Sequence, residues 1–265
     1  MTFDTLGNKE NPAVLLIHGM ISSAKDCEPF GKVLADKYYV IMPTLDGHGH
    51  DGTDLLTVDK EAEKIIQYLN DCRITSLEMI QGSSMGAEIA LEVKRQADLN
   101  HIKTGVCFFD GGPFFWFTPW FRAIMRARFR KLVKVFDTDN PDKAMEDLRN
   151  NQFLQFVAKD KLEQYSGLIR SMASERRHFS DKTVKNLVNI CYKCALPDFS
   201  NIEQKRFVFF FSKEEPARDS KKRLQKAYPF AEYKDIDGYA HCGFQSVEPV
   251  KYAQMLMEQI QKHHQ

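Results

Sequence analysis

The ten residues Leu77-Glu-Met-Ile-Gln-Gly-Ser-Ser-Met-Gly86 contain the strongest structural signal in the chain. The first five are mostly apolar, as in a buried strand, and apolar residues at helical spacing follow over Ser84–Ala97. Gly82 to Gly86 fit the pattern Gly-x-Ser-x-Gly, which at a strand-to-helix turn places the central serine on a strained, exposed tip. The pattern makes Ser84, and not Ser83, a candidate nucleophile; the alternative is a turn of small residues that only packs.

Similar apolar runs recur along the chain and alternate with helical patterns. Helical spacing of apolar residues is seen, for example, at Ala24–Lys37 and Val58–Asp71. This alternation implies right-handed crossovers and a parallel sheet that helices cover on both faces. We therefore predict the α/β fold class, with a mostly parallel, doubly wound sheet. The further strands of the sheet are expected at Ala13–Ile17, Tyr38–Met42, Gly105–Phe109, Phe207–Phe211 and Glu232–Ile236.

The alternation stops after Asp110 and returns at Phe207. Residues 113–203 contain helical patterns and loops but no convincing strand. A chain of 265 residues is long enough for one α/β core that carries an insertion. We predict a core made of residues 1–112 and 204–265, and a helical cap inserted as residues 113–203.

Composition and charge exclude several classes of protein. With 37 basic and 36 acidic residues the formal net charge is +1, so the whole molecule has no strong attraction to nucleic acid or anionic lipid. The longest apolar stretch, 105–121, is interrupted by an aspartate, glycines and prolines, so we expect no stable membrane insertion. Residues 1–10 lack the features of a secretory signal, and six scattered cysteines suit reduced thiols, which predicts a cytoplasmic location. The sequence does not indicate an oligomeric state.

A second segment that can carry chemistry is Ile17-His-Gly-Met20, directly after the first long apolar run. In acyl-transfer enzymes built on such a sheet, this loop provides one backbone N–H of the oxyanion hole, and the residue after the nucleophile provides the other. The two amides would be those of Met20 and Met85. They would meet negative charge that appears only in a tetrahedral transition state. His18 is expected to be structural and to shape the loop by hydrogen bonds.

A general base and an acid are expected after the last two strands. His241 lies in the glycine-flanked loop Gly238-Tyr-Ala-His-Cys-Gly243, where a neutral imidazole can take the proton of a serine at another strand end. A carboxylate that orients this imidazole is expected in Ser212-Lys-Glu-Glu-Pro216, and Glu215 is the preferred choice. The alternatives for the acid are Glu214, Asp219 and Asp110.

These elements resemble the α/β-hydrolase superfamily. The matching segments are Ile-His-Gly-Met at 17–20, Asp-Gly-His-Gly at 46–49, Gly-Ser-Ser-Met-Gly at 82–86, Ser-Lys-Glu-Glu-Pro at 212–216 and Gly-Tyr-Ala-His-Cys-Gly at 238–243. The order Ser84, Glu215, His241 is that family's order of nucleophile, acid and histidine. The resemblance covers residues 13–112 and 205–263, and it implies a cap inserted after the sixth strand of the family's core.

The chain departs from the family pattern in two places. Ser212 and Glu215 stand where relatives usually carry a glycine and an aspartate. The part before Asn11 is short, so one or two of the family's first strands are expected to be missing.

The predicted cap opens with an aromatic run that has two interpretations. Its side chains could line an apolar pocket over Ser84, or they could hold the cap on the core. We expect a mixture, with some of these residues facing the substrate. The candidate substrate-binding residues are Phe114, Phe115, Trp116, Phe117 and Trp120.

A basic amphipathic helix is predicted directly after this run. Phe121, Met125, Phe129, Leu132 and Phe136 form its apolar stripe. A solvated outer face is the simpler interpretation of its cations, and contact with an anionic substrate or a membrane surface is the alternative. The cations are Arg122, Arg126, Arg128, Arg130, Lys131 and Lys134.

Two groups of possible metal ligands have simpler interpretations. Residues 46–54 contain aspartates and histidines, but a density of ligand types alone is weak evidence for a metal site. Cys191 and Cys194 form a CxxC pattern without a second pair. Cys242 beside His241 is expected to be a small, buried or half-buried thiol. We predict no metal and no cofactor.

The sequence therefore predicts a serine hydrolase of the carboxylesterase, lipase or thioesterase type. It would cleave an ester or thioester of a small molecule with a hydrophobic acyl part, through an acyl-enzyme on Ser84. Two alternatives stay open. The same triad can serve amide or peptide hydrolysis, acyl transfer, or carbon–carbon bond cleavage by a hydrolase or lyase. The capped pocket could also belong to a non-catalytic ligand-binding protein.

Overall fold

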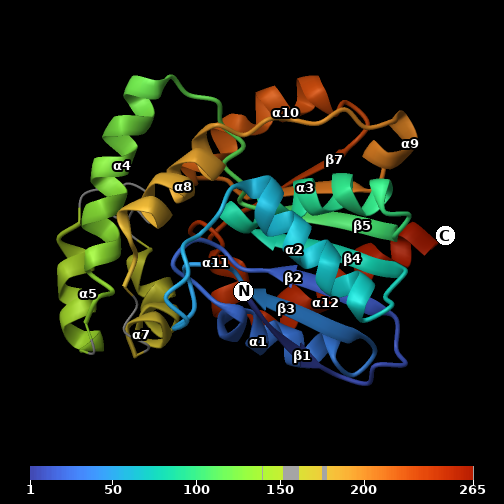
Figure 1. Cartoon of the computed structure of the whole chain (residues 1–265), viewed down its shortest axis with the longest axis horizontal. Helices are drawn as coiled ribbons and strands as arrows, with labels where there is room; N and C mark the ends of the chain where they lie inside the picture. The colour runs from blue at the N-terminus through green and yellow to red at the C-terminus, as the bar shows by residue number, and fades with distance from the viewer. Residues whose placement is uncertain (139, 152–160, 175–177, 265) are drawn as a thin grey trace.

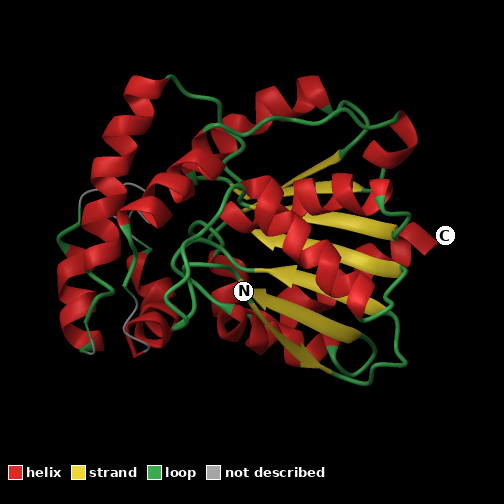
Figure 2. Cartoon of the chain, in the orientation of Figure 1, coloured by secondary structure: helices red, strands yellow, loops and turns green. Residues whose placement is uncertain are grey.

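The computed structural model describes residues 1–138, 140–151, 161–174 and 178–264. Its centre is a seven-stranded sheet in the order β1-β3-β2-β4-β5-β6-β7 (Figure 2). Neighbouring strands are parallel, except that β1 pairs with β3 in the antiparallel direction. The strands are β1(Thr2–Leu6), β2(Ala13–Ile17), β3(Tyr39–Thr44), β4(Ser76–Ser83), β5(Lys103–Asp110), β6(Phe207–Ser212) and β7(Glu232–Ile236).

The predicted α/β class and the mostly parallel sheet are confirmed. All six predicted strands are present, and their ends differ from the predicted ones by at most two residues. Strand β1 was not predicted; it fits before Asn11, where one or two of the family's first strands were expected to be missing. This strand lies at the edge of the sheet and is partly exposed, so it lacks the continuous apolar run by which buried parallel strands are recognised.

Helices cover both faces of the sheet, as the alternating pattern predicts (Figure 1). Along β2, Val14 and Leu16 pack with α1(Ala24–Leu34) and α12(Pro249–His264), whereas Leu15 and Ile17 pack in the opposite cluster. That second cluster contains the buried sides of α2(Val58–Asp71) and α3(Met85–Leu99). The remaining elements after β6 are η2(Pro216–Ser220), α10(Lys221–Ala227) and α11(Gly243–Val247).

The described residues between β5 and β6 form helices and loops and add no strand to the sheet. Figure 1 places the larger of these helices beyond the carboxyl ends of the parallel strands. Residues 139, 152–160 and 175–177 of the predicted cap lie outside the described residues. The elements here are α4(Pro119–Lys134), α5(Pro141–Arg149), η1(Leu162–Tyr165), α7(Ser166–Ser174), α8(Asp181–Tyr192) and α9(Asn201–Gln204).

Among the described residues, we find no helix whose length and apolar character would let it cross a lipid bilayer.

The strand order reverses next to β2, which has β3 on one side and β4 on the other. In open parallel sheets, ligands bind at the carboxyl ends of the strands where the order reverses. Two glycines let the chain turn tightly at this point. A Cβ on Gly82 would collide with the backbone of Gly86, and a Cβ on Gly86 would collide with the carbonyl oxygens of Ile17 and His18. Helix α3 therefore starts in direct backbone contact with the end of β2.

Gly86→Ala should lower the free energy of unfolding by about 1–3 kcal/mol, because backbone atoms that enclose Gly86 cannot move aside cheaply. The matched control is Gly167→Ala, at a helical position where an added Cβ has no neighbour within 4 Å, and which should change stability by less than about 1 kcal/mol. Urea unfolding followed by circular dichroism measures both. Equal stability of Gly86→Ala and the wild type would contradict the close packing of α3 on β2.

Candidate active site

Ser84 occupies the turn between β4 and α3 with φ 51° and ψ −123°, a conformation that L-residues rarely adopt. Its N–H donates a hydrogen bond of 2.7 Å to the carbonyl of Asp110, and its carbonyl accepts from Ala87 N–H at 2.9 Å. These bonds fix the turn from both sides. The side chain of Ser84 is half-buried and faces a large cavity.

His241 and Glu215 come from loops after the last two strands and complete a line of hydrogen bonds with Ser84. The distance between His241 Nε2 and Ser84 Oγ is 2.8 Å, and Nδ1 of the same ring hydrogen-bonds to a carboxylate oxygen of Glu215. A carboxylate only accepts, so Nδ1 carries the proton and Nε2 is free to accept the hydroxyl proton of Ser84. The other Glu215 oxygen accepts from the N–H of Ser212 at 2.6 Å.

The structure pairs His241 with Glu215 and not with the other candidate acids. Glu214 is exposed and forms an ion pair with Lys161 at 3.4 Å. Asp219 is exposed at the cavity. Asp110 is buried near His241 and Glu215. Burial, together with the negative charge of Glu215, raises the pKa of Asp110 to about 7.

Two opposing effects act on the pKa of His241. Burial lowers the pKa, but the charge and hydrogen bond of Glu215, with a contribution from Asp110, outweigh burial and raise it above the usual 6.5. The carboxylate thus favours the imidazolium form that would arise when the ring takes a proton from Ser84.

The predicted oxyanion-hole segment lies against the serine turn. A Cβ added to Gly19 would be 3.2 Å from the Cβ of Ser84, so the loop between His18 and Met20 is adjacent to the candidate nucleophile. Met85 is the first residue of α3, and the N–H groups of a first helical turn have no acceptor within the helix. Met20 follows this loop and lines the cavity, and Met85 directly follows Ser84, so both remain candidates for the oxyanion hole.

His18 has the structural role that was expected of it. Its Nε2 accepts a hydrogen bond from the N–H of Leu45 at 3.1 Å, so its Nδ1 is the donor to the carbonyl of Gly19 at 2.7 Å. The ring is buried and ties the loop after β2 to the loop after β3.

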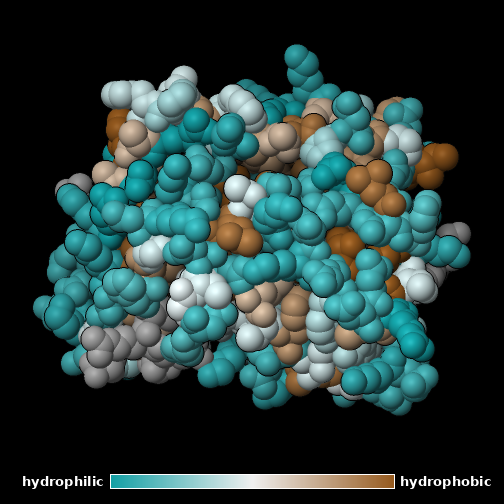
Figure 3. All heavy atoms as spheres, viewed as in Figure 1, coloured by the Kyte–Doolittle hydropathy of each residue, from teal (hydrophilic) through white to brown (hydrophobic). Residues whose placement is uncertain are grey.

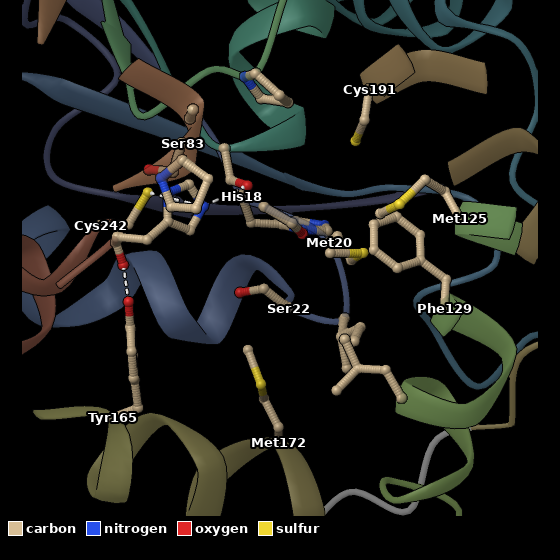
Figure 4. A pocket seen from close by; sticks show the side chains of 18 of the residues that line it. His18, Met20, Ser22, Ser83, Met125, Phe129, Tyr165, Met172, Cys191 and Cys242 are labelled. Carbon is tan, nitrogen blue, oxygen red and sulfur yellow. Dashed lines mark hydrogen bonds between the residues drawn. The ribbon is translucent and has the colours of Figure 1, made fainter. Parts of the chain in front are cut away.

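A cavity of about 620 Å³ extends from Ser84 and His241 to the helices between β5 and β6. Its walls are mostly apolar. Figure 4 shows Met125 and Phe129 of α4 on the side away from Cys242, and Met172 of α7 reaching toward the cavity. A volume of this size is typical of sites for small organic molecules.

The aromatic run divides between three environments. Phe115 and Phe117 line the cavity, as expected for substrate-binding residues. Phe114 does not: its φ of 41° turns the side chain into the core, where it is fully buried between Phe109 and Phe209.

Trp116 and Trp120 are also absent from the cavity wall. They are 57% and 72% exposed, respectively. The expectation that Phe114, Trp116 and Trp120 face the substrate is therefore corrected. The directions of neighbouring side chains in an irregular segment depend on backbone angles that an aromatic composition does not reveal.

Two residues that the sequence analysis did not single out hold the histidine loop. The hydroxyl of Tyr165 donates a hydrogen bond to the backbone carbonyl of His241 (Figure 4). The amide of Gln164 donates to the carbonyl of Gly238 at 3.0 Å, and its oxygen accepts from the N–H of Ala240 at 2.8 Å. Both side chains come from η1, so the helical segment positions the candidate base. A glutamine and a tyrosine within a helical pattern carry no sequence signal for such a contact.

Cys242 lines the cavity beside His241, with 3.9 Å between its Sγ and His241 Nε2. Burial and the charge of Asp110 raise its pKa well above 9.0, so the thiol stays protonated and is a poor nucleophile. Cys191 and Cys194 are buried free thiols. Within the described residues, no group of three or more histidine, cysteine, aspartate or glutamate side chains is arranged to hold a metal ion.

No model of a known protein family matches the sequence, and no curated protein is similar enough in sequence to be identified as a relative. Solved structures do match. An α/β-hydrolase family protein from Desulfitobacterium hafniense has a TM-score of 0.74 and 17% identity over 97% of this chain and 99% of its own. A thermophilic esterase from Thermogutta terrifontis has a TM-score of 0.71 and 15% identity, over 100% of this chain and 94% of its own.

MenH from S. aureus is similar to the same degree, with a TM-score of 0.71 and 16% identity over 99% of both chains. These similarities span nearly the whole of each protein. The chain therefore has the α/β-hydrolase fold, as the resemblance of its motifs implied.

The pKa of His241 should lie above 6.5 in the wild type and should fall below 6.5 in Glu215→Gln, because the carboxylate charge is lost while the burial of the ring remains. Titration of the ring nitrogens by NMR measures this pKa. Glu214→Gln, which changes an exposed neighbour, is the control and should leave the pKa where it is. An unchanged pKa in Glu215→Gln would refute the pairing of the two side chains.

Proposed function

We propose that this protein is a serine hydrolase that cleaves an ester or thioester with a hydrophobic acyl part. The observation that carries the proposal is the line of hydrogen bonds from Ser84 through His241 to Glu215 at the end of a largely apolar cavity. The α/β-hydrolase fold, which several esterases share, supports it. The reaction needs no cofactor.

In the first half of the reaction, Ser84 Oγ forms a bond to the acyl carbon while His241 Nε2 takes the hydroxyl proton. The carbonyl electron pair moves onto oxygen, and the amides of Met20 and Met85 stabilise that negative charge. When the tetrahedral intermediate collapses, the bond to the alcohol or thiol breaks, and the leaving group receives the proton from His241. Water then attacks the acyl-enzyme by the same route, which releases the acid and restores Ser84.

The helical segment 113–203 is proposed to act as the cap of this site. It supplies Phe115 and Phe117 and the inner side of α4 to the cavity wall. Exclusion of water by such a cover strengthens the electrostatic interactions that stabilise the transition state. Because Tyr165 and Gln164 also hold the histidine loop, the cap would both bind the acyl part and keep His241 in place.

One alternative has specific support. MenH and a meta-cleavage product hydrolase from Pseudomonas fluorescens are among the proteins of similar structure, and the fold alone does not decide between ester cleavage and other reactions of the same triad. Carbon–carbon bond hydrolysis is therefore the second candidate. Activity toward a meta-cleavage product, with none toward any ester, would favour it.

A fluorophosphonate probe should label the wild-type protein on Ser84, and Ser84→Ala should abolish labelling and lower kcat by about 10⁴-fold or more. The matched control is Ser83→Ala. The hydroxyl of Ser83 bonds to the side chains of Gln81 and Gln245 and not to His241, so this variant should still be labelled. Labelling that survives in Ser84→Ala would sink the assignment of the nucleophile.

Chain-length preference tests the role of the cavity. Met125→Trp adds bulk to the wall on α4 and should lower kcat/KM by about tenfold or more for p-nitrophenyl esters of about eight or more carbons, with a much smaller effect on the acetate. Met125→Leu conserves volume and is the control. If the loss were the same for acetate and for long chains, the acyl group would not occupy this cavity.

A further inference from the structure

The outer side of α4 exposes an unusual set of side chains. Figure 3 shows that the flank of the molecule where α4 lies is mainly hydrophilic. Trp120, Ala123, Ala127, Lys131 and Lys134 are exposed and follow one another at helical spacing, so they share one side of the helix. The other side of the same helix lines the apolar cavity. One helix thus separates the cavity from the solvent.

The segment that contains α4 carries positive charges but no acidic residue that could neutralise them. Between residues 113 and 134 the sequence contains six arginines and lysines and no acid. Arg130 forms an ion pair with Asp181 at 2.6 Å, and Arg126 donates to the carbonyl of Asp181. On the outer side of α4, Lys131 and Lys134 form no ion pair with any residue that the structure describes. Arg122 and Arg128 are also without an ion pair among those residues, but they lie on other sides of the helix, and Arg128 lines the cavity.

Three acidic side chains after α4 and on α5 already form ion pairs. Asp137, after the end of α4, pairs with His178 at 3.0 Å. On α5, Asp142 pairs with Arg170 and Asp147 with Lys143, at 2.8 and 2.6 Å. The positive charge at the end of α4 is therefore available to an anionic partner.

The two tryptophans of the chain lie at or near the start of α4, opposite the end that carries Lys131 and Lys134. Trp116 and Trp120, two of the candidate substrate-binding residues, are 57% and 72% exposed. An indole ring has a large apolar area and one N–H donor, a combination that is most favourable at the boundary between lipid headgroups and acyl chains. Exposed tryptophan and unpaired lysine along one side of a helix together favour contact with the headgroup region of an anionic bilayer.

We propose that the outer face of α4, together with Trp116, docks on an anionic lipid surface. Charge complementarity brings the cations to the headgroups, and the two indole rings enter the interface. A bilayer is favoured over an acidic protein because the two exposed large hydrophobic side chains here are indoles, and because the cavity behind the helix is apolar. The net charge of +1 means that attraction comes from this face and not from the protein as a whole.

The sequence offers a direct probe of this contact, because Trp116 and Trp120 are the only two tryptophans among the 265 residues. Vesicles with 30% phosphatidylglycerol should therefore shift the tryptophan emission of the wild type to shorter wavelength, and lipids brominated in the acyl chains should quench it. Vesicles of pure phosphatidylcholine should do neither. Salt at 0.5 M should reverse the effect, since it screens the headgroup charge.

Charge reversal identifies the face. Lys131→Glu/Lys134→Glu, at positions outside the cavity wall, should lower co-sedimentation with the anionic vesicles by about tenfold or more, while hydrolysis of a soluble short-chain ester is retained. Lys9→Glu/Lys37→Glu makes the same charge change at two exposed positions away from α4 and should bind as the wild type does.

Three results would overturn the proposal. These are the absence of any wild-type emission shift with anionic vesicles at low salt, sedimentation without quenching by brominated lipid, and equal loss of binding in both charge-reversed proteins. The emission experiment uses the unmodified chain, so it remains decisive even if a variant fails to fold. Capture of an acidic protein by this face in the absence of any vesicle response would likewise contradict lipid docking.

Discussion

The backbone of Ser84 is the constraint on which the rest of the structure depends. Its positive φ costs about 1–3 kcal/mol in an L-residue, and surrounding structure must hold it. The close approach of Gly82 and Gly86 to backbone atoms, and the 2.7 Å hydrogen bond from Ser84 N–H to the carbonyl of Asp110, provide that support. The result is a hydroxyl held beside His241 at the point where the strand order reverses, close to Gly19 and to the first turn of α3.

The helical segment between β5 and β6 is connected to this site in two ways. Its apolar side chains form much of the cavity wall, and Tyr165 with Gln164 holds the backbone of the loop that carries His241. Displacement of the segment would therefore change the shape of the cavity and would also loosen the position of His241, the candidate base. The outer side of α4 faces solvent, away from the cavity. The helix can therefore contact a lipid surface with its outer side while its inner side still lines the cavity.

Much of the fold was predictable because parallel strands are buried on both faces and leave continuous apolar runs, as at Ala13–Ile17. The line of Ser84, His241 and Glu215 was predictable because strand ends converge at one edge of the sheet. The partly exposed edge strand Thr2–Leu6 left no such signal. The directions of Phe114, Trp116 and Trp120 were not predictable either, since they follow from local backbone angles. The hydrogen bond from Tyr165 to the histidine loop is a tertiary contact between η1 and a loop after β7, and such a contact leaves no pattern in the sequence.

The central claim is that Ser84 accepts the acyl group with His241 as its base. Rapid acid quenching of the wild type with an activated long-chain ester, followed by mass spectrometry of the peptides, tests it most directly. The account predicts that the mass of the acyl group appears on the peptide that contains Ser84 and that none appears there in His241→Ala. Turnover of the ester with the acyl mass on another side chain, or an undiminished adduct without His241, would contradict it.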